Sequence, residues 1–197
     1  PFAFPITPEE EDQWEAADRY LDDACAQRGF KIIDHMSTAN TARDLDMLRQ
    51  AVGDKMLTYA GYSYGTFLGV TYANLYPDKV RALVVDGVLD PIAWTTGNPG
   101  EENTIPFSTR LRSDKGALDT LNEFFRLCDE NPATCAFAGR SADRFATLAA
   151  SLWIAPIQIF LPDGSLFTFT YQDLIGNSLG AMYDSFSWPD FAQFLAG

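Results

Sequence analysis

The pentapeptide Gly-Tyr-Ser-Tyr-Gly at positions 61–65 constrains the fold of this chain more than any other feature. A short strand-like run precedes it at residues 55–60, and residues 66–76 after it are apolar on all sides, as in a buried helix. Residues 80–86 then form a continuous apolar run, which is typical of a strand buried on both faces. Strand, helix and strand at this spacing predict a βαβ unit with a parallel pair, and hence an α/β fold.

The central serine of this pentapeptide is a candidate nucleophile. A serine between two glycines in a strand-to-helix turn projects its hydroxyl from the end of a sheet, and larger neighbours would collide with the turn. The start of the following helix offers free N–H groups and a positive dipole end. We therefore predict Ser63 as the nucleophile and the Tyr64 N–H as an oxyanion donor. The alternative is a glycine-rich turn in which Ser63 caps the helix.

A serine nucleophile needs a histidine base and an orienting carboxylate, which in this arrangement follow the serine along the chain. The only histidine, His35, precedes Ser63, so its order is wrong for the base and we expect a loop residue beside a helix start. Asp86 and Asp90 end the second strand. Either is a candidate acid in a variant arrangement, but a turn or loop role is the preferred interpretation.

The predicted sheet is incomplete. Two parallel strands leave open edges, and parallel sheets need further strands and covering helices. Together with the missing downstream histidine and the start at Pro1, this predicts that the chain is an internal segment of a larger protein. The sequence pattern changes near residue 95, which divides residues 1–95 from a mainly helical part, residues 96–197. Residues 95–112 read as a loop, and later helices are expected near 116–129, 141–152, 171–183 and 188–196, with a hairpin at 157–170.

Two helices are predicted before the βαβ unit. Thr7 and Glu10 have the spacing of a capping box, and the amphipathic helix that follows should end at Gly29. The second helix should run from about Thr38 or Thr41 to Ala51. Its apolar side chains are expected to face inward and its charged ones outward: Leu45, Leu48 and Val52 against Arg43, Asp44, Asp46 and Arg49.

Cysteines and charge bear on environment and partners. Cys128 and Cys135 lie seven positions apart without a CxxC or a nearby histidine, which disfavours zinc. A small-loop disulfide is expected if the protein is exported, two buried thiols are the alternative, and Cys25 is left over. The net charge of −13 repels phosphate backbones, and no apolar run is long enough for a membrane helix. We expect no nucleic-acid partner, membrane span, metal or cofactor, and leave the oligomeric state open.

The segments around the pentapeptide resemble a known family. Residues 36–49, 57–66 and 76–91, and more weakly 128–138 and 166–183, resemble the tripeptidyl aminopeptidase-like α/β-hydrolases, secreted bacterial serine exopeptidases related to proline iminopeptidases. The resemblance implies a partial α/β-hydrolase core with a nucleophile elbow in 1–95 and a cap or lid in 96–197. Ser63 matches the nucleophile and Tyr64 the oxyanion position. The family's acid, base, second oxyanion donor and first strands match no residue of this chain.

The same resemblance implies an exported enzyme, secreted or in the cell envelope, that releases short peptides from peptide N-termini through an acyl-enzyme on Ser63. An esterase of the same fold and a catalytically silent segment or binding module are the alternatives. No substrate-binding residue is assigned. The candidates, each weighed against a solvated or core role, are Glu101, Glu102 and Glu123 for the α-ammonium and Trp94, Trp153 and Trp188 for a pocket.

Overall fold

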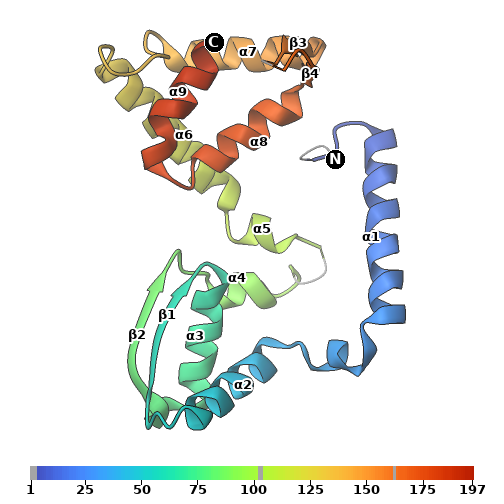
Figure 1. The fold of residues 1–197 in the computed structure, drawn as a ribbon, viewed down its shortest axis with the longest axis vertical. Coiled ribbons are helices and arrows are strands. Elements are labelled where there is room, and N and C mark those ends of the chain that lie inside the picture. The colour runs from blue at the N-terminus through green and yellow to red at the C-terminus, as the bar shows by residue number, and fades with distance from the viewer. Residues whose placement is uncertain (1–3, 102–103, 162) are drawn as a thin grey trace. The chain divides into compact units, whose positions relative to one another are not determined.

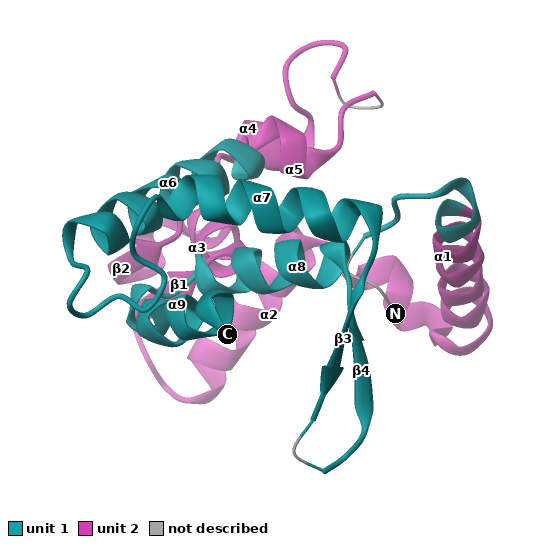
Figure 2. Ribbon diagram, turned by 90° about the horizontal axis from the view of Figure 1, so that it is seen from above, with its two compact units in different colours: residues 1–11, 113–197 teal, residues 12–112 magenta. Residues whose placement is uncertain are grey.

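The computed structural model describes residues 4–101, 104–161 and 163–197, which form two compact units. One unit comprises residues 12–112 and the other residues 1–11 and 113–197 (Figure 2). The expectations that rest on Pro1 and on Glu102 lie outside the described residues. The predicted division into domains at residue 95 stays a prediction.

The predicted βαβ unit lies within residues 12–112 (Figure 1). The chain passes from β1 (Leu57–Tyr62) through α3 (Tyr64–Leu75) and η2 (Pro77–Lys79) to β2 (Val80–Asp86). The two strands pair in parallel, with Tyr62 opposite Asp86. This arrangement confirms the predicted partial α/β core.

One expectation about this unit was wrong, namely that β2 is buried on both faces. The side chain of Val84 is 62% exposed, although its neighbours Leu83 and Val85 are partly buried. The reason is that α3 packs against β1 and β2 from one side, and within the described part of residues 12–112 the opposite face of the strands has no comparable cover.

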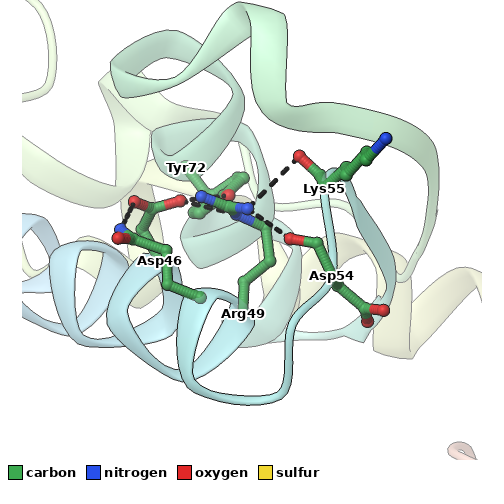
Figure 3. Close-up of polar contacts among 6 residues, drawn as sticks. Asp46, Arg49, Asp54, Lys55 and Tyr72 are labelled. Atoms are coloured by element: carbon green, nitrogen blue, oxygen red, sulfur yellow. Dashed lines mark hydrogen bonds and ion pairs between the residues drawn. The ribbon is translucent and has the colours of Figure 1, made fainter.

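The helix before the sheet, α2 (Thr38–Ala51), packs against α3 with a face that only partly matches the predicted one. As predicted, Leu45 is partly buried and Arg43 and Asp44 are exposed. Asp46 and Arg49 are 7% and 8% exposed, whereas Leu48 and Val52 are 62% and 73% exposed. The cause is a polar cluster shown in Figure 3. Arg49 Nε donates to Asp46 Oδ1 at 2.8 Å, and the Tyr72 hydroxyl of α3 donates to the same oxygen at 2.9 Å.

This cluster also holds the connection from α2 to β1. The Arg49 guanidinium donates to the backbone carbonyls of Asp54 and Lys55 (Figure 3). The hydrogen bond from Arg49 keeps the pKa of Asp46 below its ordinary value, although burial opposes that shift. Burial raises the pKa of the Tyr72 phenol, whose side chain is fully enclosed. Both members of this buried ion pair therefore have further hydrogen-bond partners, and the pair connects α2 to the segments around it.

The N-terminal helix α1 (Pro8–Arg28) begins and ends where the sequence predicts. Glu10 N donates to Thr7 Oγ1 at 3.3 Å, and the Glu10 carboxylate accepts from Thr7 N at 3.3 Å and from Ile6 N at 2.8 Å. None of the residues of α1 is buried. Its apolar stripe is therefore not part of either core. A 3-10 helix, η1 (Phe30–His35), follows.

The stretch expected to be a loop contains a short helix, and another short helix ends where the stretch begins. α4 (Pro91–Thr95) is followed by α5 (Phe107–Arg110), which lies inside the predicted loop. The Arg110 guanidinium donates to the carbonyl oxygens of Ala93, Thr95 and Thr96 at 2.9, 3.1 and 3.3 Å. This long-range capping of α4 by one arginine carries no local sequence pattern, so the prediction missed it.

The unit of residues 1–11 and 113–197 is mainly helical, as predicted. Its elements are α6 (Ser113–Glu130), α7 (Ser141–Ile154), the antiparallel hairpin of β3 (Ile157–Phe160) and β4 (Leu166–Phe169), α8 (Tyr171–Ala181), η3 (Ser185–Ser187) and α9 (Trp188–Ala196). Its core is built mostly from aromatic and aliphatic side chains of the helices, including Phe124, Phe125, Phe145, Leu152, Leu174, Phe191 and Leu195. Among the described residues, no helix is both long and apolar enough to cross a membrane.

The end of α6 is tied to the start of α7. A disulfide joins Cys128 to Cys135, whereas Cys25 is a free, exposed thiol. Next to the disulfide, the Asp129 carboxylate accepts from Ser141 Oγ at 2.6 Å and from Gly139 N at 2.8 Å. The Ser141 hydrogen bond holds the pKa of Asp129 below its usual range. The disulfide and the Asp129 carboxylate thus both hold the connection between α6 and α7.

Candidate active site

Ser63 occupies the turn between β1 and α3 in a strained backbone conformation. Its φ of 53° and ψ of −124° lie in a region that residues other than glycine rarely adopt. The residue is exposed, and its hydroxyl makes no capping hydrogen bond to α3. Helix capping therefore does not account for the strain.

Three glycines make room for this turn and for the ring of Tyr59 beneath it. A Cβ at Gly61 would lie 2.5 Å from the carbonyl oxygen of Gly65, so the turn closes only without that side chain. A Cβ at Gly69 would lie 2.7 Å from the Tyr59 ring, and one at Gly65 would lie 3.3 Å from its hydroxyl. The Tyr59 hydroxyl donates to the Gly65 carbonyl at 2.7 Å. Burial raises the pKa of this phenol.

Hydrogen bonds hold Ser63 on both sides of its Cα. Ser63 N donates to the carbonyl of Asp86 at 3.1 Å, which ties the turn to the end of β2. On the other side, Thr66 N and Thr66 Oγ1 both donate to the carbonyl of Ser63, at 2.9 and 2.6 Å. Leu89 N donates to Thr66 Oγ1 at 3.0 Å. The surrounding structure therefore imposes the strained conformation.

Tyr64 is the first residue of α3, so its N–H lies at the positive end of the helix. Its hydroxyl shares a hydrogen bond of 2.7 Å with Thr38 Oγ1. The centroid of its ring lies 6.0 Å from that of the Trp94 ring. Trp94 packs edge-on against Phe107, with 4.7 Å between the ring centroids. Trp94, a predicted pocket tryptophan, therefore lies beside the first residue of the helix that follows Ser63.

The candidate acids have structural roles, and the candidate base is exposed. His35 is exposed in η1, and the Asp90 carboxylate caps α4 by accepting from Ile92 N and Ala93 N at 2.8 and 3.2 Å. Asp86 contributes its backbone carbonyl to Ser63 N. Within the described residues, the structure brings none of the three side chains into hydrogen-bond contact with Ser63.

The two described carboxylates among the candidates for the α-ammonium also have hydrogen-bond partners. Glu101 accepts from the backbone and side-chain nitrogens of Asn98, which lowers its pKa, and Glu123 pairs with Arg126 at 2.6 Å. In residues 113–197, Trp188 packs into the core against Phe124. Trp153 packs edge-on against Tyr171 and stays 60% exposed.

Comparison with known proteins places this geometry in a family. The profile of the alpha/beta hydrolase fold matches residues 8–124, more than half of the chain. The chain therefore belongs to the α/β-hydrolase family.

Individual relatives refine this result. The chain is 52% identical over 69 residues to tripeptidyl aminopeptidase of Streptomyces lividans, covering 35% of this chain and 13% of the relative. It is 41% identical over 103 residues to serine protease Hip1 of Mycobacterium tuberculosis H37Rv, covering 52% and 18%. It is 33% identical over 183 residues to carboxylesterase B of Mycobacterium tuberculosis CDC 1551, covering 91% and 32%. These matches confirm the predicted aminopeptidase-like resemblance, and the chain spans less than a third of each relative's length.

The sequence analysis did not identify Tyr59 and Thr66 as the residues that support the Ser63 turn. One available signal was the regular spacing of Gly61, Gly65 and Gly69, which places three small residues on one side of the turn and α3. The partner of Thr66 had no such signal, because Leu89 lies 23 residues further along the chain.

Proposed function

We propose that Ser63 is the nucleophile of a serine hydrolase. The observation that carries this proposal is the strained conformation of Ser63, with φ 53° and ψ −124°, between a parallel strand and a helix start. Strain of this size costs about 1–3 kcal/mol and is kept where function uses it. A hydroxyl that is exposed and does not cap the helix is free to attack a carbonyl carbon.

In the proposed mechanism, a histidine base takes the proton of Ser63 Oγ as this oxygen forms a bond to the substrate's carbonyl carbon. The carbonyl π bond breaks, and the carbonyl oxygen becomes an oxyanion that the Tyr64 N–H stabilises. When this intermediate collapses, the base returns the proton to the departing amine or alcohol, and the resulting acyl-enzyme is hydrolysed by water. The histidine base and the acid are proposed to come from residues outside the sequence described, because His35 is exposed and precedes Ser63.

We further propose an exported aminopeptidase that releases short peptides from peptide N-termini. Similarity to an enzyme named tripeptidyl aminopeptidase supports the reaction, and the Cys128–Cys135 disulfide supports an oxidising compartment. In this proposal residues 1–95 belong to the hydrolase core and residues 96–197 to a cap that limits access to the site.

An esterase is the second candidate. It is favoured by the similarity to carboxylesterase B, which extends over 91% of this chain, further than the match to the aminopeptidase. Both candidates use the same nucleophile and differ in the leaving group.

The test is to measure hydrolysis by the full-length protein and its Ser63→Ala variant. The substrates are a tripeptide p-nitroanilide with a free N-terminus, the same peptide with a blocked N-terminus, and p-nitrophenyl butyrate. We expect the free peptide to be preferred, and the variant to lose at least about a thousandfold in kcat while keeping its melting temperature. A fluorophosphonate should label wild type at Ser63 alone.

The outcomes separate the candidates. Preference for the butyrate ester would support the esterase. Equal rates on free and blocked peptides would contradict an aminopeptidase. Full activity and full labelling in Ser63→Ala would refute the serine hydrolase itself.

A further inference from the structure

Thr66 joins the strained turn to a segment outside it. Its side chain is 1% exposed and lies in the first turn of α3. Its hydroxyl accepts from Leu89 N at 3.0 Å and donates to the Ser63 carbonyl at 2.6 Å. The backbone N–H of Thr66 donates to the same carbonyl at 2.9 Å. The Ser63 carbonyl is therefore held by two donors from one residue, and one of those donors is itself oriented by Leu89.

This arrangement determines where the next N–H points. The peptide bond between Ser63 and Tyr64 is a rigid plane, in which the Ser63 carbonyl and the Tyr64 N–H point in opposite directions. Fixing the carbonyl therefore fixes the N–H. An oxyanion donor is effective only when it is aimed before the reaction at the place where the charge develops.

We propose that Thr66 is a positioning residue that aims the Tyr64 N–H at the oxyanion through the Ser63–Tyr64 peptide plane. This inference rests on the proposed function, since it assumes that Ser63 forms a tetrahedral intermediate. It goes beyond that function by assigning the side-chain hydroxyl of a residue that never touches the substrate. The loop after β2 is part of the same device, because Leu89 N orients the hydroxyl.

The chain offers a matched control on the same helix. Thr71 Oγ1 donates to the Phe67 carbonyl at 2.7 Å, so it makes a similar local hydrogen bond. It lies two turns from Ser63, away from the Ser63–Tyr64 peptide. Thr66→Val and Thr71→Val remove one hydroxyl each at nearly constant volume, and Thr66→Ser keeps the hydroxyl.

The experiment measures kcat and KM of the full-length variants on the tripeptide p-nitroanilide or on p-nitrophenyl butyrate, whichever Ser63 hydrolyses. It also measures Ki for a trifluoromethyl ketone with the same acyl group, which forms a tetrahedral oxyanion adduct on the serine. For Thr66→Val we expect kcat to fall about 10- to 100-fold with KM within about twofold, and Ki to rise by the factor that kcat loses. Thr66→Ser and Thr71→Val should stay within about threefold of wild type in kcat and Ki.

Several results would overturn the inference. Wild-type kcat in folded Thr66→Val, or a loss of kcat with unchanged Ki, would show that the hydroxyl does not aim the donor. An equal loss in Thr71→Val would assign the effect to general weakening of α3. If Thr66→Val does not fold, Thr66→Ala, which adds no bulk, carries the same expectations. Activity that survives in Ser63→Ala would refute the proposed function and this inference together, whereas a dead Ser63→Ala beside a fully active Thr66→Val refutes the inference alone.

Discussion

The ring of Tyr59 fills the space that a Cβ at Gly69 would need, 2.7 Å from its Cε1 atom, while the Tyr59 hydroxyl bonds to the Gly65 carbonyl at 2.7 Å. One side chain of β1 therefore sets both the distance between strand and helix and the position of the first helical turn. The turn that holds Ser63 is supported by this contact from beneath, and α3 is kept close to the sheet.

Gly69→Ala should destabilise the protein, although alanine normally favours a helix over glycine. The new methyl group has to displace the Tyr59 ring or move α3, which costs about 1–3 kcal/mol. Chemical denaturation of the full-length protein measures the change, and fluorophosphonate labelling of Ser63 should slow in parallel. Gly116→Ala in α6 is the control, because its Cβ would meet nothing within 4 Å. Equal stability of the two variants would contradict the tight contact.

Stability should fall in acid because of Asp46. The hydrogen bond from Arg49 holds the folded-state pKa of Asp46 below the ordinary carboxyl value of about 4. The resulting stabilisation is therefore complete above that ordinary value and is lost as the pH falls through the lower, folded-state pKa. We expect the melting temperature of Asp46→Asn to be lower than that of wild type at pH 7, and the difference to shrink below about pH 4.

The control for this prediction is Asp44→Asn, which changes an exposed carboxylate on the same helix. Its melting temperature should follow that of wild type at every pH. If Asp46→Asn and Asp44→Asn have the same melting curves from pH 3 to pH 7, the buried cluster does not contribute to stability.

The Cys128–Cys135 disulfide should stabilise residues 113–197. It closes a loop of eight residues, for which the chain-entropy relation gives about 2–3 kcal/mol. Replacing both cysteines by alanine should lower the free energy of unfolding by this amount, and Cys25→Ser should leave it unchanged, since that thiol is exposed. Without reductant, peptide mapping after alkylation should find Cys25 modified and the other two protected. Ready alkylation of all three would show that the bond is absent.

The βαβ unit and most helices could be predicted because their signals are local. Thr7 and Glu10 form the capping box that their spacing predicts, and α1 ends before Gly29. The burial of two charged residues of α2 could not be predicted in this way. The local sequence indicates that Asp46 and Arg49 face solvent. Their burial depends on Tyr72, 26 residues beyond Asp46, whose hydroxyl bonds to the Asp46 carboxylate.

The candidate site divides along the same line. Ser63 and its glycines could be found because a strained strand-to-helix turn restricts the residue types within five positions. Tyr59 and Thr66 could not, because a tyrosine in a strand and a threonine in a helix are ordinary until their contacts with Gly69 and Leu89 are known. Burial, rather than local pattern, decides their roles.

The bond from Ser63 N to the carbonyl of Asp86, with that from Leu89 N to Thr66, has a consequence for the order of folding. Asp86 and Leu89 are synthesised more than twenty residues after Ser63. While β1 and α3 stand alone, the strained conformation therefore lacks these two restraints and has only those within α3, and the pairing of β2 supplies the rest. During synthesis, the conformation of Ser63 is fully restrained only after the second strand has paired, because a chain that ends earlier lacks these two hydrogen bonds.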